Sequence, residues 1–390
     1  MIIIKINGYN KMDTELFTWH TQSDTLNDFK VGLTLAQNSG AKSLLVLTCN
    51  QNNYPEKELS SLLSDCPLKL FGGIYPMLTL QDSLLKQGAL IIGFKDNFDV
   101  TLFSQLNHVN NEDCLEKLIT STLEQKYNFS GHDNFLIFYD ALIGNMEGFV
   151  DCLFECLDHG INIAGGGAGS LDFIQRPCIF TNQGIHSNAV LLVTLPRKLN
   201  TSVAHGWSTF QGPFLVTETQ GQTVKSLDYR PAYEVYCQTI ESTSEHKFNN
   251  AEFSDIAKYF PLGIEDINNN LIVRDPILAH DNNLQCVGNI PINSMVYLLE
   301  GNTETLIYAT EQAAFTAFPE LSQTTISTTM VFDCLSRVLF LEDEFEKELN
   351  VIAKHCPSPA LFGVISLGEI ANSQSGAIRL LNKSIVISSW

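Results

Sequence analysis

Residues 161–170 read INIAGGGAGS, a short apolar run that ends in four glycines and a serine. An earlier run, LKLFGGIYP at residues 68–76, carries a glycine pair in a similar setting. Each is followed by a second apolar run, GALIIGF at 88–94 and NAVLLVTL at 188–195. Runs of this length are typical of buried strands, and glycine lets two backbones approach closely. The two stretches therefore predict one strand pattern that is used twice.

The residues around each glycine run complete a repeated unit. In the first copy, residues 23–102, an apolar helical stripe, the strand SLLVLTC and a short helix precede the glycine pair. The second copy, residues 112–195, keeps this order, and a looser third copy runs from EQAAFTAF at 311–318 to KSIVISSW at 383–390. Helices alternate with strands, while some strands follow each other too closely for a helical crossover. We predict an α/β (α+β) protein of mixed β-sheets with packed helices, built on a repeated α-β-α-β-β unit.

The chain is long enough for two domains. Its 390 residues exceed the size at which a single core stops growing, roughly 250 to 300 residues. A different block, residues 214–300, separates the second copy from the third and contains a strand pair, a helix and further strands. We predict an N-terminal extension at 1–27, a first domain at 28–222 that holds the duplication, and a second domain at 223–390.

Composition limits the partners and the compartment. The chain has 43 acidic and 23 basic residues, a formal charge of −20. Nucleic acids and anionic lipid surfaces are bound through clustered Lys and Arg, so neither is an expected partner. We find no secretory signal, no apolar run of about 18 residues that would span a membrane, and no disulfide framework among the ten cysteines. These features predict a cytoplasmic protein.

The glycine run itself is a candidate ligand site. Gly165, Gly166, Gly167 and Ser170 could cradle a small anion or cofactor, because glycine allows close approach of a ligand to the backbone. The run lacks the Lys of a phosphate-binding loop, and Ser170 stands where the dinucleotide fingerprint needs its last glycine. A tight turn or bulge in a crowded sheet explains the same residues. Both interpretations stay open at this point.

His205 is the histidine with distinctive neighbours. It lies between an apolar strand and a glycine, two residues before Trp207, near the junction between the duplicated part and the central block. A haem iron needs an axial histidine inside an apolar and aromatic pocket, so His205 is the candidate axial ligand and Trp207 a candidate ligand contact. A packed, hydrogen-bonded histidine at a domain junction is the alternative.

Charged residues inside apolar runs form a third candidate site. Arg274, Arg337 and Glu369 lie within or beside predicted strands, where charges are costly unless they are paired or face a cavity. Arg337 and Glu369 could line a pocket for a ligand that carries both charges, such as a free amino acid. A structural salt bridge is the alternative.

We expect no catalytic activity. The chain contains no G-x-S-x-G elbow for a serine nucleophile, and no histidine lies near Cys334 in the sequence to activate its thiol. Cys152, Cys156 and His159 have helical spacing for three soft metal ligands, but no second ligand pair accompanies them. We therefore interpret them as ordinary partly buried thiols, with a metal site as the alternative.

A set of segments resembles the FIST family, with its N-terminal and C-terminal FIST domains. The segments are INIAGGGAGSLDF (161–173), AHGWSTFQGPFLVTETQGQTVKSLDYRPAYEVY (204–236), NLIVRDP (270–276), FDCLSR (332–337) and LGEI (367–370), which follow the family's order. The resemblance covers residues from about 28 to the C-terminus, and 204–236 is its most specific part. The chain departs from the family at LNKS (381–384), where a His-rich turn is expected.

The resemblance implies a function in signal transduction. FIST domains are regarded as intracellular sensory modules for small ligands, with amino acids proposed, and members of similar length include haem proteins that sense nitric oxide and act on a histidine kinase. The resemblance thus implies a small-molecule ligand, with haem as a cofactor and a histidine kinase as a partner. A haem-free receptor for an amino acid or similar metabolite is the alternative.

Overall fold

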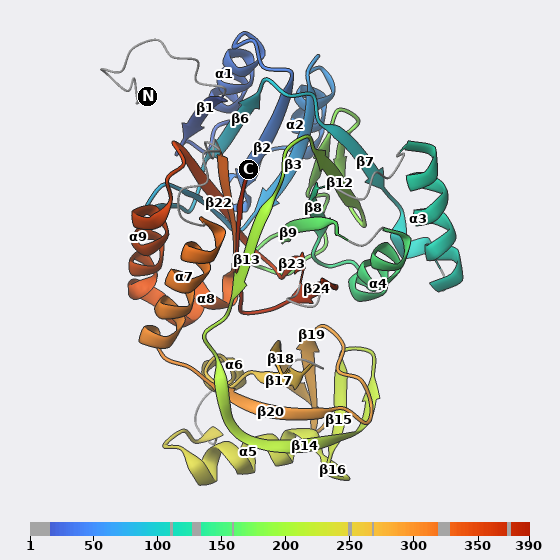
Figure 1. The fold of residues 1–390 in the computed structure, drawn as a ribbon, viewed down its shortest axis with the longest axis vertical. Coiled ribbons are helices and arrows are strands. Elements are labelled where there is room, and N and C mark those ends of the chain that lie inside the picture. The colour runs from blue at the N-terminus through green and yellow to red at the C-terminus, as the bar shows by residue number, and fades with distance from the viewer. Residues whose placement is uncertain are drawn as a thin grey trace.

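The repeated unit of the sequence forms three six-stranded sheets with the same internal order. The computed structural model describes residues 16–109, 112–126, 134–157, 160–248, 252–266, 269–318, 328–372 and 376–390. Most of the predicted N-terminal extension lies outside these ranges, and its end holds the first strand, β1. Figure 1 shows the three sheets packed together as one body, with a smaller lobe attached at one end.

The first unit supplies four strands of its sheet. Strands β2 and β3 run parallel, α2 makes the crossover between them, and β6 and β1 follow antiparallel on the other side of β2. Every residue of β2 is buried, as expected for a parallel strand covered on both faces. The elements of this unit are β1 (Leu16–Thr21), α1 (Leu26–Gln37), β2 (Ser43–Cys49), α2 (Glu56–Ser64), β3 (Lys69–Tyr75) and β6 (Ala89–Phe94).

The second and third units repeat this arrangement. Parallel pairs β8–β9 and β21–β22 take the place of β2–β3, and β12 and β25 take the place of β6. The second unit contains β7 (Asp99–Phe103), α3 (Glu112–Lys126), β8 (Asn134–Asp140), α4 (Met146–Cys156), β9 (Asn162–Ala168) and β12 (Val190–Leu195). The third contains β13 (Asn200–Ala204), α7 (Thr303–Ala317), β21 (Thr328–Cys334), α8 (Leu335–Leu341), α9 (Phe345–His355), β22 (Ala360–Ser366) and β25 (Ile385–Ser389). The predicted repeat is therefore confirmed.

Each unit also gives a hairpin to another unit's sheet. The hairpin β4–β5 pairs with β22, β10–β11 pairs with β3, and β23–β24 pairs with β9. Their bounds are β4 (Met77–Leu80), β5 (Ser83–Leu85), β10 (Ile179–Thr181), β11 (Gly184–His186), β23 (Glu369–Asn372) and β24 (Ile378–Leu381). At the centre, Phe138 packs against Phe71 and Phe332, so all three sheets share one core.

One glycine position recurs in all three units. It is the fourth residue of the second parallel strand, and a Cβ there would lie 1.8 to 2.4 Å from a carbonyl oxygen of the neighbouring strand. The glycines and the residues whose oxygens they face are Gly72 and Val46, Gly165 and Ile137, and Gly363 and Val331. The first glycine of each motif is therefore required by close strand packing.

The central block folds into the lobe. Its strands follow the order β14-β20-β17-β18-β19-β15-β16, and a further pairing of β14 with β15 closes them into a barrel. The elements are β14 (Ser208–Gln220), β15 (Thr223–Leu227), β16 (Arg230–Pro231), α5 (Ala232–Thr243), α6 (Phe253–Ala257), β17 (Leu262–Glu265), β18 (Leu271–His280), β19 (Asn283–Val287) and β20 (Met295–Glu300). The predicted domain boundary after residue 222 falls inside this barrel, between β14 and β15.

Short 3₁₀ turns complete the described chain at Asn50–Asn52, Leu106–His108 and Glu342–Glu344. Among the described residues, no helix is both long and apolar enough to cross a membrane. The predicted class, an α/β protein with mixed sheets in two parts, is confirmed.

Candidate ligand site

The glycine run occupies β9 in the interior of the body. Gly165 faces the Ile137 carbonyl, and a Cβ on Gly166 would lie 2.8 Å from the Ser366 side chain. The same addition to Gly167 would meet the Leu367 carbonyl at 2.7 Å. All three glycines are buried and pair within the sheet, so their immediate surroundings are protein atoms.

Ser170 lies just beyond β9, at the start of the connection to β10. Its hydroxyl donates to Asp172 over 2.5 Å and accepts from the Arg176 guanidinium at 3.1 Å. Arg176 also binds both carboxylate oxygens of Asp172. Ser170 therefore organises a loop, and it does not join the other predicted site residues.

His205 and Trp207 lie where the chain leaves the body for the lobe. Nδ1 of His205 accepts a hydrogen bond of 3.0 Å from the Trp207 backbone N–H, and the ring also hydrogen-bonds the Leu271 backbone. Burial lowers the pKa of His205 to about 4, and the nearby Arg337 charge acts in the same direction. The imidazole is therefore neutral at physiological pH.

This arrangement does not fit a haem iron on His205. An axial histidine binds iron through a free lone pair on a ring nitrogen. Nδ1 of His205 accepts the Trp207 N–H, which places the proton of the neutral ring on Nε2, so neither nitrogen offers a free lone pair. Trp207 itself is 4% exposed and packs edge-on against Phe340, with ring centroids 5.0 Å apart. The described junction is thus filled by its own side chains.

Arg337 is fully buried, and protein groups surround its guanidinium. Nε and Nη2 bind the same Glu348 oxygen at 3.0 and 2.5 Å, and Asp333 lies 3.5 Å away. Nη1 donates to the His205 carbonyl at 2.6 Å, and Nη2 donates to the Leu306 carbonyl at 3.2 Å. Arg337 therefore holds both connections between body and lobe, the outgoing one at His205 and the returning one in α7.

Glu369 does not pair with Arg337. One of its carboxyl oxygens accepts from the Ser366 hydroxyl at 2.8 Å, and the other has no hydrogen-bond partner although it is buried. Burial raises the pKa of Glu369 to about 8, while the hydrogen bond from Ser366 and the nearby Cys334 thiol act to lower it. Glu369 also faces Gly166 in the register of β23 with β9, so these two predicted residues do meet.

Cys334 lies beside Glu369 at the end of β21. Burial, followed by the Glu369 charge, raises the pKa of its thiol far above the ordinary value. A nucleophilic cysteine needs the opposite shift, because the thiolate is the reactive form. Among the described residues, no group of three or more His, Cys, Asp and Glu side chains could hold a metal ion. His159 of the predicted cysteine and histidine set lies outside those residues.

Sequence reasoning missed Lys383, which lies in the LNKS turn. Its ammonium is 3.3 Å from an Asp275 oxygen in the lobe and donates to the Lys258 carbonyl at 3.0 Å. Its carbonyl accepts from the Trp207 indole N–H at 3.3 Å. Nothing local in the sequence marks Lys383, because its partners come from distant segments.

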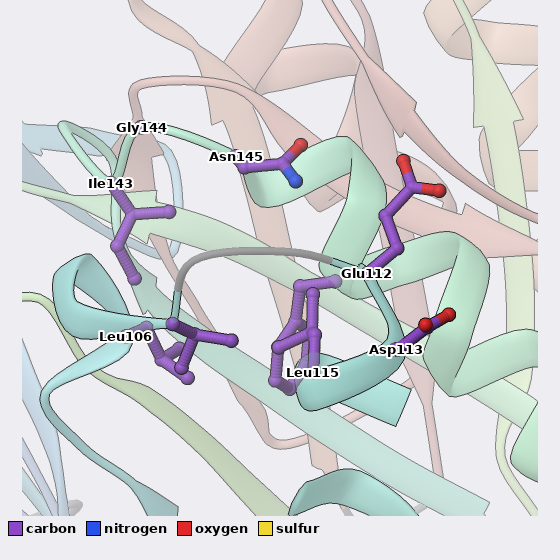
Figure 2. A pocket seen from close by; sticks show the side chains of 9 residues that line it. Leu106, Glu112, Asp113, Leu115, Ile143, Gly144 and Asn145 are labelled. Carbon is purple, nitrogen blue, oxygen red and sulfur yellow. The ribbon is translucent and has the colours of Figure 1, made fainter. Parts of the chain in front are cut away.

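A ligand-sized cavity lies elsewhere, between the starts of α3 and α4. It has a volume of about 620 Å³, within the range of about 300 to 1,000 Å³ that is typical of small-molecule sites. Figure 2 shows the apolar side chains of Leu106, Ile143 and Leu115, with the Asn145 amide above them and the carboxylates of Glu112 and Asp113 on the right. The lining residues are Leu106, Val109, Glu112, Asp113, Leu115, Ile143, Gly144, Asn145 and Phe149. A groove of about 360 Å³ shares Glu112 and Asp113 and continues between the two helices.

Helix α4 links this cavity to the lobe. Asn145 caps the helix by accepting from the Gly148 N–H at 3.1 Å, and its side chain lines the cavity. Two residues later, Glu147 binds Arg274 of β18 at 2.6 Å and accepts the Asn289 backbone N–H. Arg274 is only 6% exposed. One turn of helix therefore touches both the cavity and the lobe.

The structure is thus a body of three sheets with a cavity of ligand size, joined by buried contacts to a separate barrel lobe. The FIST N domain model matches residues 43–230, and the FIST C domain model matches residues 232–372. The chain belongs to the FIST family. FIST domains are associated with signal transduction and the sensing of small ligands. A search of curated proteins finds no match.

Proposed function

We propose that this protein is a cytoplasmic sensor without haem, and that it binds a small metabolite in the cavity between α3 and α4. The observation that carries the proposal is the first turn of α4. Asn145 lines the cavity there, and Glu147 holds the lobe through Arg274 at 2.6 Å. A ligand that moves this turn changes the contact between body and lobe.

The chemistry of the cavity favours an amino acid or a similar metabolite. Glu112 and Asp113 can bind an ammonium group, and the Asn145 side chain can bind a polar group beside it. Leu115 and Phe149 supply an apolar surface for a hydrocarbon part. Among the described residues, neither Lys nor Arg lines the cavity, so the electrostatics of these residues favour a cation over an anion.

Signalling in this proposal is a shift between two arrangements of the lobe. A ligand changes that equilibrium only when it binds one arrangement more tightly than the other. A partner protein, such as a histidine kinase, then reads the position of the lobe. The support for a kinase partner is the family resemblance alone.

Haem with nitric oxide on the iron is the other form of this proposal. It requires the junction to rearrange, because His205 and Trp207 are hydrogen-bonded to each other. An absorption spectrum of protein purified from cells supplied with haem separates the two forms. A Soret band in the wild type that is lost in His205→Ala would favour haem. A wild-type spectrum without a Soret band favours the metabolite.

Gly144 offers a direct test of the cavity. It lines the cavity, and a Cβ added there meets no atom within 4 Å. A thermal-shift screen of amino acids and amines should find a ligand that stabilises the protein by about 2.7 kcal/mol at 100 times its Kd. Gly144→Leu should abolish this stabilisation, and Gly144→Ala should retain most of it. A ligand whose shift is equal in both variants would place binding elsewhere.

A further inference from the structure

A buried group of charged side chains lies under the two connections to the lobe. Four carboxyls and two cations belong to it, and each residue is at most 6% exposed. Arg337 pairs with Glu348 at 2.5 Å and with Asp333 at 3.5 Å, and Lys383 pairs with Asp275 at 3.3 Å. Among the described residues, Glu369 is the acid of this group for which no ion pair is found. Both carboxyl oxygens of Asp333 and one of Glu369 have no hydrogen-bond partner among the described residues.

Four carboxyls against two cations leave an excess of negative charge, so Asp333 and Glu369 cannot both be ionised at low cost. A buried carboxylate without a partner loses its hydration, so the neutral acid is favoured. Burial raises the pKa of Asp333 well above its usual range, and the Glu348 charge raises it further. For Glu369 the value reaches about 8, which lies close to physiological pH.

Contacts through the LNKS turn, residues 381–384, link Glu369 to the segment at His205 and Trp207 that leads into the lobe. The Ser384 backbone N–H and the Cys334 thiol face the Glu369 carboxyl, and both act to lower its pKa. Cys334 in turn accepts the Lys383 N–H at 3.3 Å, and the Lys383 carbonyl accepts from Trp207 and Arg337. A change at Glu369 therefore reaches the residues that hold the lobe.

The connections themselves are closely packed. Gly206 has φ +81°, and a Cβ there would lie 2.6 Å from the Thr305 carbonyl of the returning chain. Arg337 bridges the same two segments of the chain by donating to the carbonyls of His205 and Leu306. We call this contact between residues 204–207 and 301–306 the seam. Glu369 has no exposed surface, so its carboxylate meets water only when the structure around it opens.

We propose that protonation of Glu369 latches the lobe onto the body, and that its ionisation opens the seam at the two connections. The groups that face Glu369 from the surrounding elements are Asp333 and Cys334 of β21, Ser366 of β22, Tyr139 of β8 and Arg337 of α8, with Lys383 and Ser384 in the turn and Glu348 and Asp275 behind them. The latch needs no bound ligand, so it goes beyond the proposed metabolite sensing and stands independently of it.

The sign of the pH effect follows from linkage. The closed state holds the Glu369 proton up to about pH 8, and the opened, hydrated state releases it near the ordinary carboxyl value. As the pH increases toward about 8, the ratio of open to closed protein therefore rises by up to about tenfold per pH unit. Above about pH 8 the ratio levels off. His205 acts with the opposite sign and at lower pH, because its pKa in the folded protein is about 4.

Hydrogen exchange on the full-length protein between pH 6.5 and 9.5 tests the latch. Protection factors at residues 204–208 and 301–306, corrected for intrinsic exchange chemistry, should fall by about tenfold per pH unit up to about pH 8 and then level off. Glu369→Gln, which mimics the protonated acid, should lower this slope by about one decade per pH unit. Glu346→Gln, an exposed change on α9, should behave as the wild type.

A slope that is unchanged in Glu369→Gln, or protection that does not vary with pH in the wild type, would overturn the latch. If Glu369→Gln does not fold, infrared spectroscopy of the wild type decides instead. The carbonyl band of a protonated, buried carboxyl should disappear with the same midpoint as the loss of protection. Disappearance without any change in protection would reject the connection to the lobe.

Discussion

Replacing Glu147 with alanine removes the contact that joins α4 to the lobe. Arg274 would keep its backbone acceptors, the carbonyls of Val273 at 3.1 Å and Leu380 at 3.2 Å, but it would lose its carboxylate. Its side chain is 7% exposed, so a charge would be left in the interior without a counter-ion. Breaking a buried ion pair in this way costs about 3 to 5 kcal/mol. Because Glu147 is 16% exposed, we expect a loss of about 3 kcal/mol.

Urea denaturation measures this loss as a change in the free energy of unfolding. Glu234→Ala is the matched control, because its exposed pair with Arg230 should contribute less than about 1 kcal/mol. Adding Arg274→Met to Glu147→Ala should recover part of the loss, since the stranded charge is then removed. A loss below about 1 kcal/mol for Glu147→Ala, or none recovered in the double variant, would refute the assigned role of this ion pair.

Three further predictions follow from the same geometry. Gly165→Ala should destabilise the fold by about 3 kcal/mol or more, measured by urea denaturation, because its Cβ would meet the Ile137 carbonyl at 1.8 Å; Gly144→Ala should cost far less, and equal losses would contradict the packing argument. The free energy of unfolding should fall as the pH drops from about 6.5 toward 4, because His205 binds a proton in the unfolded protein but stays neutral in the folded one. His205→Gln should reduce this loss, and a pH profile identical to that of the wild type would contradict burial of the ring. Alkylation followed by mass spectrometry should modify the exposed Cys114 well before the buried Cys334, and faster labelling of Cys334 would point to an activated thiol.

The repeated unit could be predicted because its signals are local. Helical periodicity, short apolar runs and the glycine motifs all lie within single units of the sequence, and the three sheets follow them. The exchanged hairpins could not be predicted in the same way. Strand β4 at residues 77–80 pairs with β22 at 360–366, and no periodicity within either segment encodes that partner.

The candidate site shows the same limit of local signals. The sequence correctly marks Arg337 and Glu369 as costly buried charges, yet their partners are Glu348 and Ser366. Choosing among several acids requires knowledge of which helix packs on α8. The cavity was missed for a related reason, because its wall is assembled from the starts of two helices and a turn that are apart in the sequence.

Hydrogen exchange with and without the metabolite found by thermal shift tests the central claim most directly. In the wild type, the ligand should change protection both at the start of α4, residues 145–149, and in the lobe around Arg274. In Glu147→Ala the change at α4 should persist, while the change in the lobe should be lost. A lobe response that survives in Glu147→Ala, or a ligand that leaves α3 and α4 unaffected, would contradict the coupling of the cavity to the lobe.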